Sequence, residues 1–111
     1  MTVEGLWKIG FVSNNSTAGA GILVLETERI FGGDTSFYYL GHYTVKDGHL
    51  IGTATVKRYS PYLPSVFPEI EDFQLEIDGT FNTDSIKGIA KMAGVSNNEL
   101  VFVMNKLADL P

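Results

Sequence analysis

The sequence predicts an all-β fold, and three observations support this prediction. Apolar residues recur with period two far more than with the period of a helix. Twelve glycines are spread over 111 residues, and polar turn clusters separate the alternating runs. About eight candidate strands follow one another at the spacing expected of sandwiches and barrels. Because most connections are short and a closed sheet leaves no exposed edge, we expect an antiparallel up-and-down barrel of about eight strands.

The first predicted strand, residues 6–12, shows the alternation simply. Its odd positions Trp7, Ile9 and Phe11 are large and apolar, and they fall on one face of an extended chain. A polar cluster at 13–17 follows and predicts a turn. We therefore expect these three side chains to enter a shared core.

A hairpin is predicted at Asp47 and Gly48. This pair separates two long alternating runs, 37–45 and 49–59, and suits the positive φ of a tight primed turn. The segment 60–68 contains three prolines, which remove ladder donors, so it predicts a long connection and not a strand.

The clearest strand with one solvent-exposed face contains Phe73, Leu75 and Ile77, because polar or acidic residues alternate with them. We expect these three side chains to face the same core. Asp78 and Gly79 then predict a second tight turn. The eight predicted strands are residues 6–12, 19–25, 29–31, 37–45, 49–59, 73–77, 86–92 and 100–106.

Glycines interrupt four of the predicted strands, at Gly10, Gly21, Gly52 and Gly88. Small residues allow sharp strand coiling at barrel corners, which is the commoner cause, or they leave the barrel interior partly unfilled. The sequence leaves both explanations open.

Composition restricts the classes of protein. The formal net charge is −5, whereas holding a phosphate backbone needs clustered lysine and arginine, so we expect no direct nucleic-acid binding. The chain has no cysteine, which excludes disulfides, thiolate metal sites and a cysteine nucleophile. With 44% hydrophobic and 19% charged residues, we expect a single domain over residues 1–111. The chain shows neither a leader pattern nor an apolar run of membrane-span length, so we expect a cytoplasmic protein without a membrane partner.

Residues that could carry catalysis or bind a metal are few. The predicted hairpin turn at Asp47 is flanked by His42 and His49, and these three residues could supply metal ligands. Ordinary strand or surface histidines are much commoner than metal or acid–base pairs. The glycine-rich segments lack the strand–glycine–helix context of a phosphate cradle, and no nucleophile elbow is present. We expect no enzyme activity, no cofactor and no metal site.

Two further clusters are candidates for binding. Glu69, Glu71 and Asp72 could act as a general acid and base if buried, but exposed acidic loop residues are commoner. Aromatic residues fall on both faces of the strand at 37–45, so some of them must be exposed or at an interface. We assign Phe37, Tyr39 and Tyr43 to a dimer or partner surface, and packing of the rings over the barrel ends is the alternative.

Three segments carry a family resemblance: GAGILV at 19–24, IFGGD at 30–34 and YLGHY at 39–43. In order and spacing they resemble the GrlR family of negative regulators of type III secretion. The likeness extends more loosely through residues 56–59, 64–66 and 73–75. The resemblance implies an eight-stranded lipocalin-like barrel that forms a dimer and represses virulence-gene expression. It also implies the mechanism, which is binding of a helix-turn-helix transcriptional activator. An acidic protein suits a basic DNA-binding partner.

One departure from the family concerns its acidic activator-binding loop. The loop that corresponds here reads Lys46, Asp47, Gly48 and cannot present an acidic patch, so the densest remaining acidic cluster, Glu69 to Asp72, is our candidate for partner binding. The alternative function, by fold analogy, is a lipocalin-like carrier or sensor that holds a small apolar ligand inside the barrel.

Overall fold

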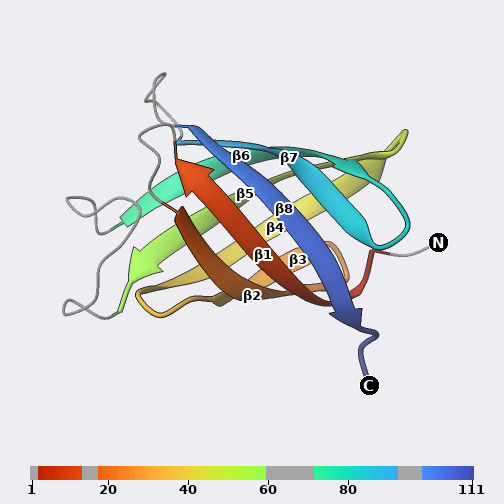
Figure 1. The fold of residues 1–111 in the computed structure, drawn as a ribbon, viewed down its shortest axis with the longest axis horizontal. Helices are drawn as coiled ribbons and strands as arrows, with labels where there is room; N and C mark the ends of the chain where they lie inside the picture. The colour runs from red at the N-terminus through yellow and green to blue at the C-terminus, as the bar shows by residue number, and fades with distance from the viewer. Residues whose placement is uncertain (1–2, 14–17, 60–71, 93–98) are drawn as a thin grey trace.

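The computed structural model describes residues 3–13, 18–59, 72–92 and 99–111. They form a closed antiparallel barrel of eight strands that pair in chain order, and β8 pairs back with β1 (Figure 1). The predicted fold class is therefore confirmed. The strands are β1 (Gly5–Ser13), β2 (Ala18–Glu26), β3 (Arg29–Gly33), β4 (Phe37–Lys46), β5 (His49–Arg58), β6 (Asp72–Phe81), β7 (Ser85–Met92) and β8 (Glu99–Ala108).

Two tight turns at one end of the barrel use residues in the left-handed region. Asp47 and Gly48 have φ values of 53° and 78°, and Thr27 and Glu28 have 52° and 62°. Positive φ at both central residues matches the right-handed twist of the flanking strands. The hairpin predicted at Asp47 and Gly48 is confirmed.

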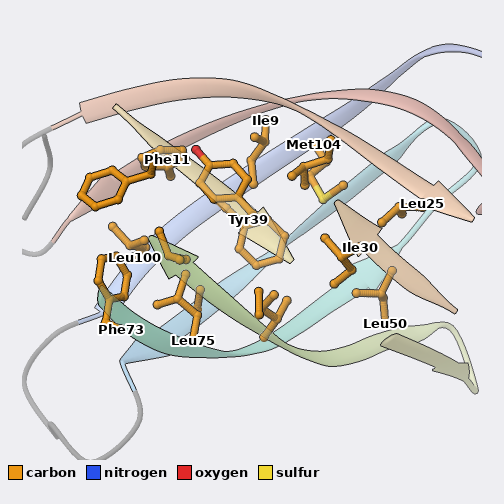
Figure 2. Close-up of a pocket in the computed structure, with 17 residues that line it drawn as sticks. Ile9, Phe11, Leu25, Ile30, Tyr39, Leu50, Phe73, Leu75, Leu100 and Met104 are labelled. Atoms are coloured by element: carbon orange, nitrogen blue, oxygen red, sulfur yellow. The ribbon is translucent and has the colours of Figure 1, made fainter. Parts of the chain in front are cut away.

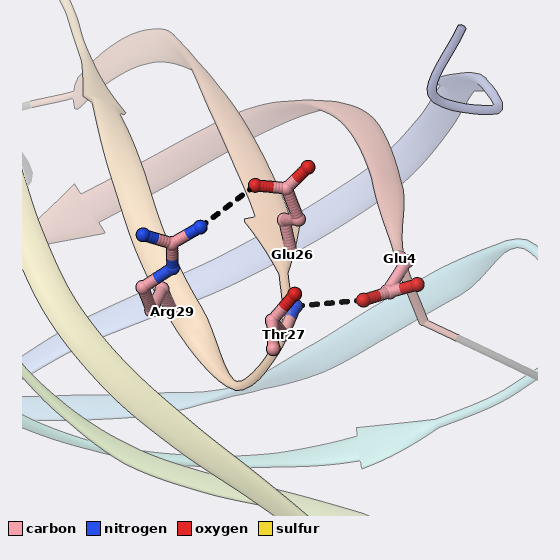
Figure 3. Close-up of polar contacts among 4 residues, drawn as sticks. All are labelled: Glu4, Glu26, Thr27 and Arg29. Carbon is pink, nitrogen blue, oxygen red and sulfur yellow. Dashed lines mark hydrogen bonds and ion pairs between the residues drawn. The ribbon is translucent and has the colours of Figure 1, made fainter.

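Polar contacts hold the β2–β3 turn, which contains no glycine (Figure 3). The Glu4 carboxylate accepts a hydrogen bond of 2.7 Å from the Thr27 backbone N–H. Beside it, Arg29 and Glu26 form an ion pair of 2.9 Å across the turn. The contact from Glu4 ties the segment before β1 to this turn, at the end of the barrel where both termini lie.

The turn predicted at Asp78 and Gly79 is wrong, because both residues lie within β6. A Cβ built on Gly79 would lie 2.7 Å from Cγ2 of Ile86. Glycine is therefore needed here for close packing of strands and not for a turn. The chain reverses instead after Phe81, where the Asn82 N–H donates to the Ser85 carbonyl at 2.8 Å.

Three of the four interrupting glycines lie where the neighbouring strand approaches closely. A Cβ at Gly21, Gly52 or Gly88 would lie 2.7, 2.3 or 2.1 Å from a carbonyl oxygen of that strand. No real side chain fits at such distances without a shift of the backbone. Gly10 differs, since nothing lies within 4 Å of its Cβ position.

The predicted core residues face one interior. Trp7 and Phe11 are buried, and Ile9, Phe73, Leu75 and Ile77 are partly buried against the same cluster. Val3 is also buried, and its carbonyl accepts a hydrogen bond of 2.9 Å from the indole N–H of Trp7. This bond fixes the segment before β1 against the core. In the part of the chain that the structure describes, no helix is long and apolar enough to span a membrane.

Candidate functional site

The barrel encloses an apolar cavity of about 80 Å³, which we call the interior cavity. All eight strands contribute inward-pointing side chains to its wall, because alternate residues of each strand point inward. Figure 2 shows that Phe11, Tyr39 and Phe73 lie toward one end of the barrel and Leu25, Ile30 and Leu50 toward the other. The lining residues are Ile9, Phe11, Leu23, Leu25, Ile30, Phe37, Tyr39, Leu50, Ala54, Val56, Phe73, Leu75, Ile77, Ala90, Leu100, Phe102 and Met104.

Tyr39 carries the one hydroxyl among these lining residues. That hydroxyl donates a hydrogen bond to Oδ2 of Asp34. Burial raises the pKa of the Tyr39 hydroxyl well above its ordinary value, and the hydrogen bond to Asp34 raises it further. Tyr39 is therefore neutral at physiological pH, and its hydroxyl proton is already engaged.

Asp34 organises the loop between β3 and β4. Its Oδ1 accepts hydrogen bonds of 2.8 Å from the backbone N–H groups of Ser36 and Phe37. The Tyr59 hydroxyl donates to the Asp34 carbonyl, and the Tyr59 N–H donates to the Ser36 carbonyl at 2.9 Å. The sequence analysis missed this cluster, although aspartate two residues before serine is a typical turn pattern.

The prediction that Phe37, Tyr39 and Tyr43 form an outward surface is wrong. Their side chains are 3%, 8% and 5% exposed, because the register of β4 with β5 points the odd residues of β4 into the barrel. The even residues face outward, and Leu40 is 55% exposed. The structure thus moves the candidate surface of β4 to its other face.

The outward apolar side chains form two groups that lie on different sides of the barrel. On one side, Val12 lies directly across from Val101, which lies across from Ile89 at the edge of the hollow described below. On β2 to β4, Phe31 lies between Val24 and Leu40. We call the group on β1 and β8 the outer apolar face, and it comprises Val12, Val101 and Val103, all exposed.

The outer face of β4 to β7 carries a hollow of about 830 Å³ that is lined by both charged and apolar side chains. Charged side chains of both signs line it, among them Glu76, directly across from Lys91. His42 lines this hollow. On the same side, Nδ1 of His49 lies 3.4 Å from Oδ1 of Asp78. Among the described residues, no group of three histidine, aspartate or glutamate side chains is placed to hold a metal ion.

The acidic cluster predicted to bind a partner falls at the edge of the described structure. Glu69 and Glu71 lie outside the described residues, and Asp72 begins β6, paired with Lys57. The assignment of these three residues stays a prediction.

Comparisons with known proteins assign no family to the chain. No protein-family model matches the chain, and no curated protein matches it. Among solved structures, the chain is similar to a redesigned β-barrel, with 10% sequence identity, a TM-score of 0.48, and coverage of 95% of this chain and 91% of that one. The class is fixed by the strand pairing itself: a closed eight-stranded antiparallel up-and-down barrel.

Proposed function

We propose that this chain is a non-enzymatic, cytoplasmic regulatory protein of the GrlR kind, which acts through protein–protein contact. Two observations support the proposal: the likeness of three segments to that family, and the outer apolar face. The second carries more weight, since contiguous exposed apolar surface on a small protein marks an interaction site. The largest exposure on this face is that of Val101, at 60%.

The occupant of this face is a second copy of the chain. Two copies with a formal charge of −5 repel each other, and they meet most easily where carboxylates are absent. None of the three residues of the outer apolar face is acidic. A two-fold axis would bring the same patch of both copies together and cover it on both.

Sedimentation velocity tests this pairing. The unmodified protein should sediment as a dimer at micromolar concentration, and Val101→Lys should sediment as a monomer because it buries a charge at the contact. Ile51→Lys is the matched control, since Ile51 is 50% exposed but lies in the hollow over β4 to β7. A monomeric unmodified protein, or equal effects of the two substitutions, would contradict the proposed dimer.

The regulatory partner is a basic helix-turn-helix activator, as the family resemblance implies, and its binding site is the cluster Glu69, Glu71 and Asp72. Attraction between exposed charges acts mostly on the association rate and weakens with salt. The double reversal Glu71→Lys with Asp72→Lys should slow capture of the activator and flatten its salt dependence. An unchanged association rate and salt dependence would remove the cluster from the proposal.

A second candidate function has an observation of its own. The interior cavity is closed in by all eight strands and lined by apolar groups, which favours a carrier or sensor of a small apolar molecule. Native mass spectrometry of protein purified from its host separates the two functions, because a retained polypeptide favours the regulator and a retained small molecule favours the carrier.

A further inference from the structure

The wall of the interior cavity limits the class of molecule that it can take, an inference that rests on the second candidate function. The seventeen lining residues include no lysine, arginine, histidine, aspartate or glutamate. The Tyr39 hydroxyl in that wall already donates its proton to Asp34. A carboxylate or phosphate inside the cavity would find no cation in the described wall. Burying an unpaired charge is strongly unfavourable.

Arg58 lies near this wall without belonging to it. Its guanidinium carbon is 5.5 Å from the ring centroid of Phe37, and Phe37 is a lining residue. Arg58 itself does not line the cavity. Its stacking on the ring is a cation–π contact that supports the wall.

Size and polarity restrict the occupant further. The volume of about 80 Å³ is roughly half that of an engineered apolar cavity of ~150 Å³ that stays dry and binds benzene. A water molecule would lack the two to four polar partners that hold buried water in place. We propose that the interior cavity binds one small, uncharged apolar molecule no larger than benzene, and excludes anionic amphiphiles such as fatty acids.

Methyl resonances of the full-length chain provide the test, with benzene and benzoate as the two probes. Benzene should shift the methyl signals of lining residues such as Leu23, Ile77 and Met104 in a saturable way. The methyl signals of Val101, on the outer apolar face, should not move. Benzoate carries the same ring with a carboxylate, so it should bind at least about tenfold more weakly.

Filling the cavity gives a second readout. Ala54 and Ala90 both line the cavity, and Ala54→Val with Ala90→Val should weaken benzene binding at least about tenfold by occupying its space. Ala20→Val is the matched control, because Ala20 is exposed on the outer side of β2. If the double variant does not fold, the methyl map of the unmodified protein decides.

The outcomes separate the inference from the carrier function. Benzoate binding within tenfold of benzene, above all if Arg58→Met abolishes it, would overturn the inference and leave a carrier of charged ligands. Binding of neither probe would overturn both. Equal benzene binding by the filled variant and the Ala20→Val control, or shifts confined to outer methyl groups, would also overturn the inference.

Discussion

Strands β6 and β8 both send apolar side chains into the barrel, but their outer faces differ. In β6, Gln74 and Glu76 face outward, so the outer face of this strand is polar and exposed to solvent. In β8, Leu100 and Phe102 are buried while Val101, between them, is 60% exposed. Folding depends on the inner face of each strand, because only that face is removed from contact with water when the barrel closes. The apolar outer face of β8 therefore points to a role in binding.

The largest expected effect separates the two faces of β8. Phe102→Ala removes a buried ring, and we expect it to lower the free energy of unfolding by about 3–5 kcal/mol. Val101→Ala, at the exposed neighbouring position, should lower it by less than about 1 kcal/mol. Denaturant titration of both variants measures the contrast. Comparable losses would mean that the outer face of β8 also contributes to folding.

A smaller loss of folding stability is expected when the polar group of the cavity wall, the Tyr39 hydroxyl, is removed. Tyr39→Phe deletes the hydroxyl that donates to Asp34, which should lower the free energy of unfolding by about 1.5–3 kcal/mol because the acceptor is a carboxylate. Tyr38→Phe, on the exposed side of the same strand, is the control and should change little. Equal stabilities in thermal unfolding would rule out a structural role for this bond.

The same residue predicts a dependence on alkaline pH. Burial and the bond to Asp34 raise the pKa of Tyr39 in the folded state above its unfolded value of 10.0. The folded state thus retains a proton that the unfolded state loses, so the contribution of Tyr39 to stability should be constant below about pH 10 and fall above it. Tyr39→Phe should make that fall shallower. Burial also raises the pKa of Tyr43, so part of the fall should remain.

The close approach of neighbouring strands can be tested by comparing two glycines. A Cβ at Gly88 would lie 2.1 Å from the Asp78 carbonyl oxygen, whereas Gly10 has nothing within 4 Å. We expect Gly88→Ala to cost about 1–3 kcal/mol through overpacking, and Gly10→Ala to be neutral or to stabilise by up to about 1 kcal/mol. Thermal unfolding measures both, and the opposite order would contradict the close approach of β6 and β7.

Much of the fold could be predicted from the sequence, because alternation and turn residues are local signals. The hairpin at Asp47 and Gly48 follows from such a signal. The same signal failed at Gly79, where a tertiary contact with Ile86 requires glycine inside a strand. The face of β4 was also misassigned, since aromatic residues lie on both sides and only the pairing with β5 decides which side is inside.

The candidate sites were less predictable than the fold. A cavity is the volume that side chains leave unfilled, so it depends on how all eight strands pack together and on no single motif. The outer apolar face likewise joins residues from β1 and β8, which are far apart in the sequence and come together only when the barrel closes. The resemblance of three segments implied a dimer, and the aromatic pattern of residues 37–45 named the wrong side chains of β4 for its surface.

Site-specific cross-linking tests the central claim, that the outer apolar face pairs two copies, most directly. The chain has no cysteine, so Val101→Cys and Ile51→Cys each introduce a single thiol at a comparably exposed position. With a short bis-maleimide at micromolar protein concentration, Val101→Cys should give a covalent dimer, and Ile51→Cys should stay monomeric. Equal dimer yields for the two variants, or none for Val101→Cys, would contradict this account.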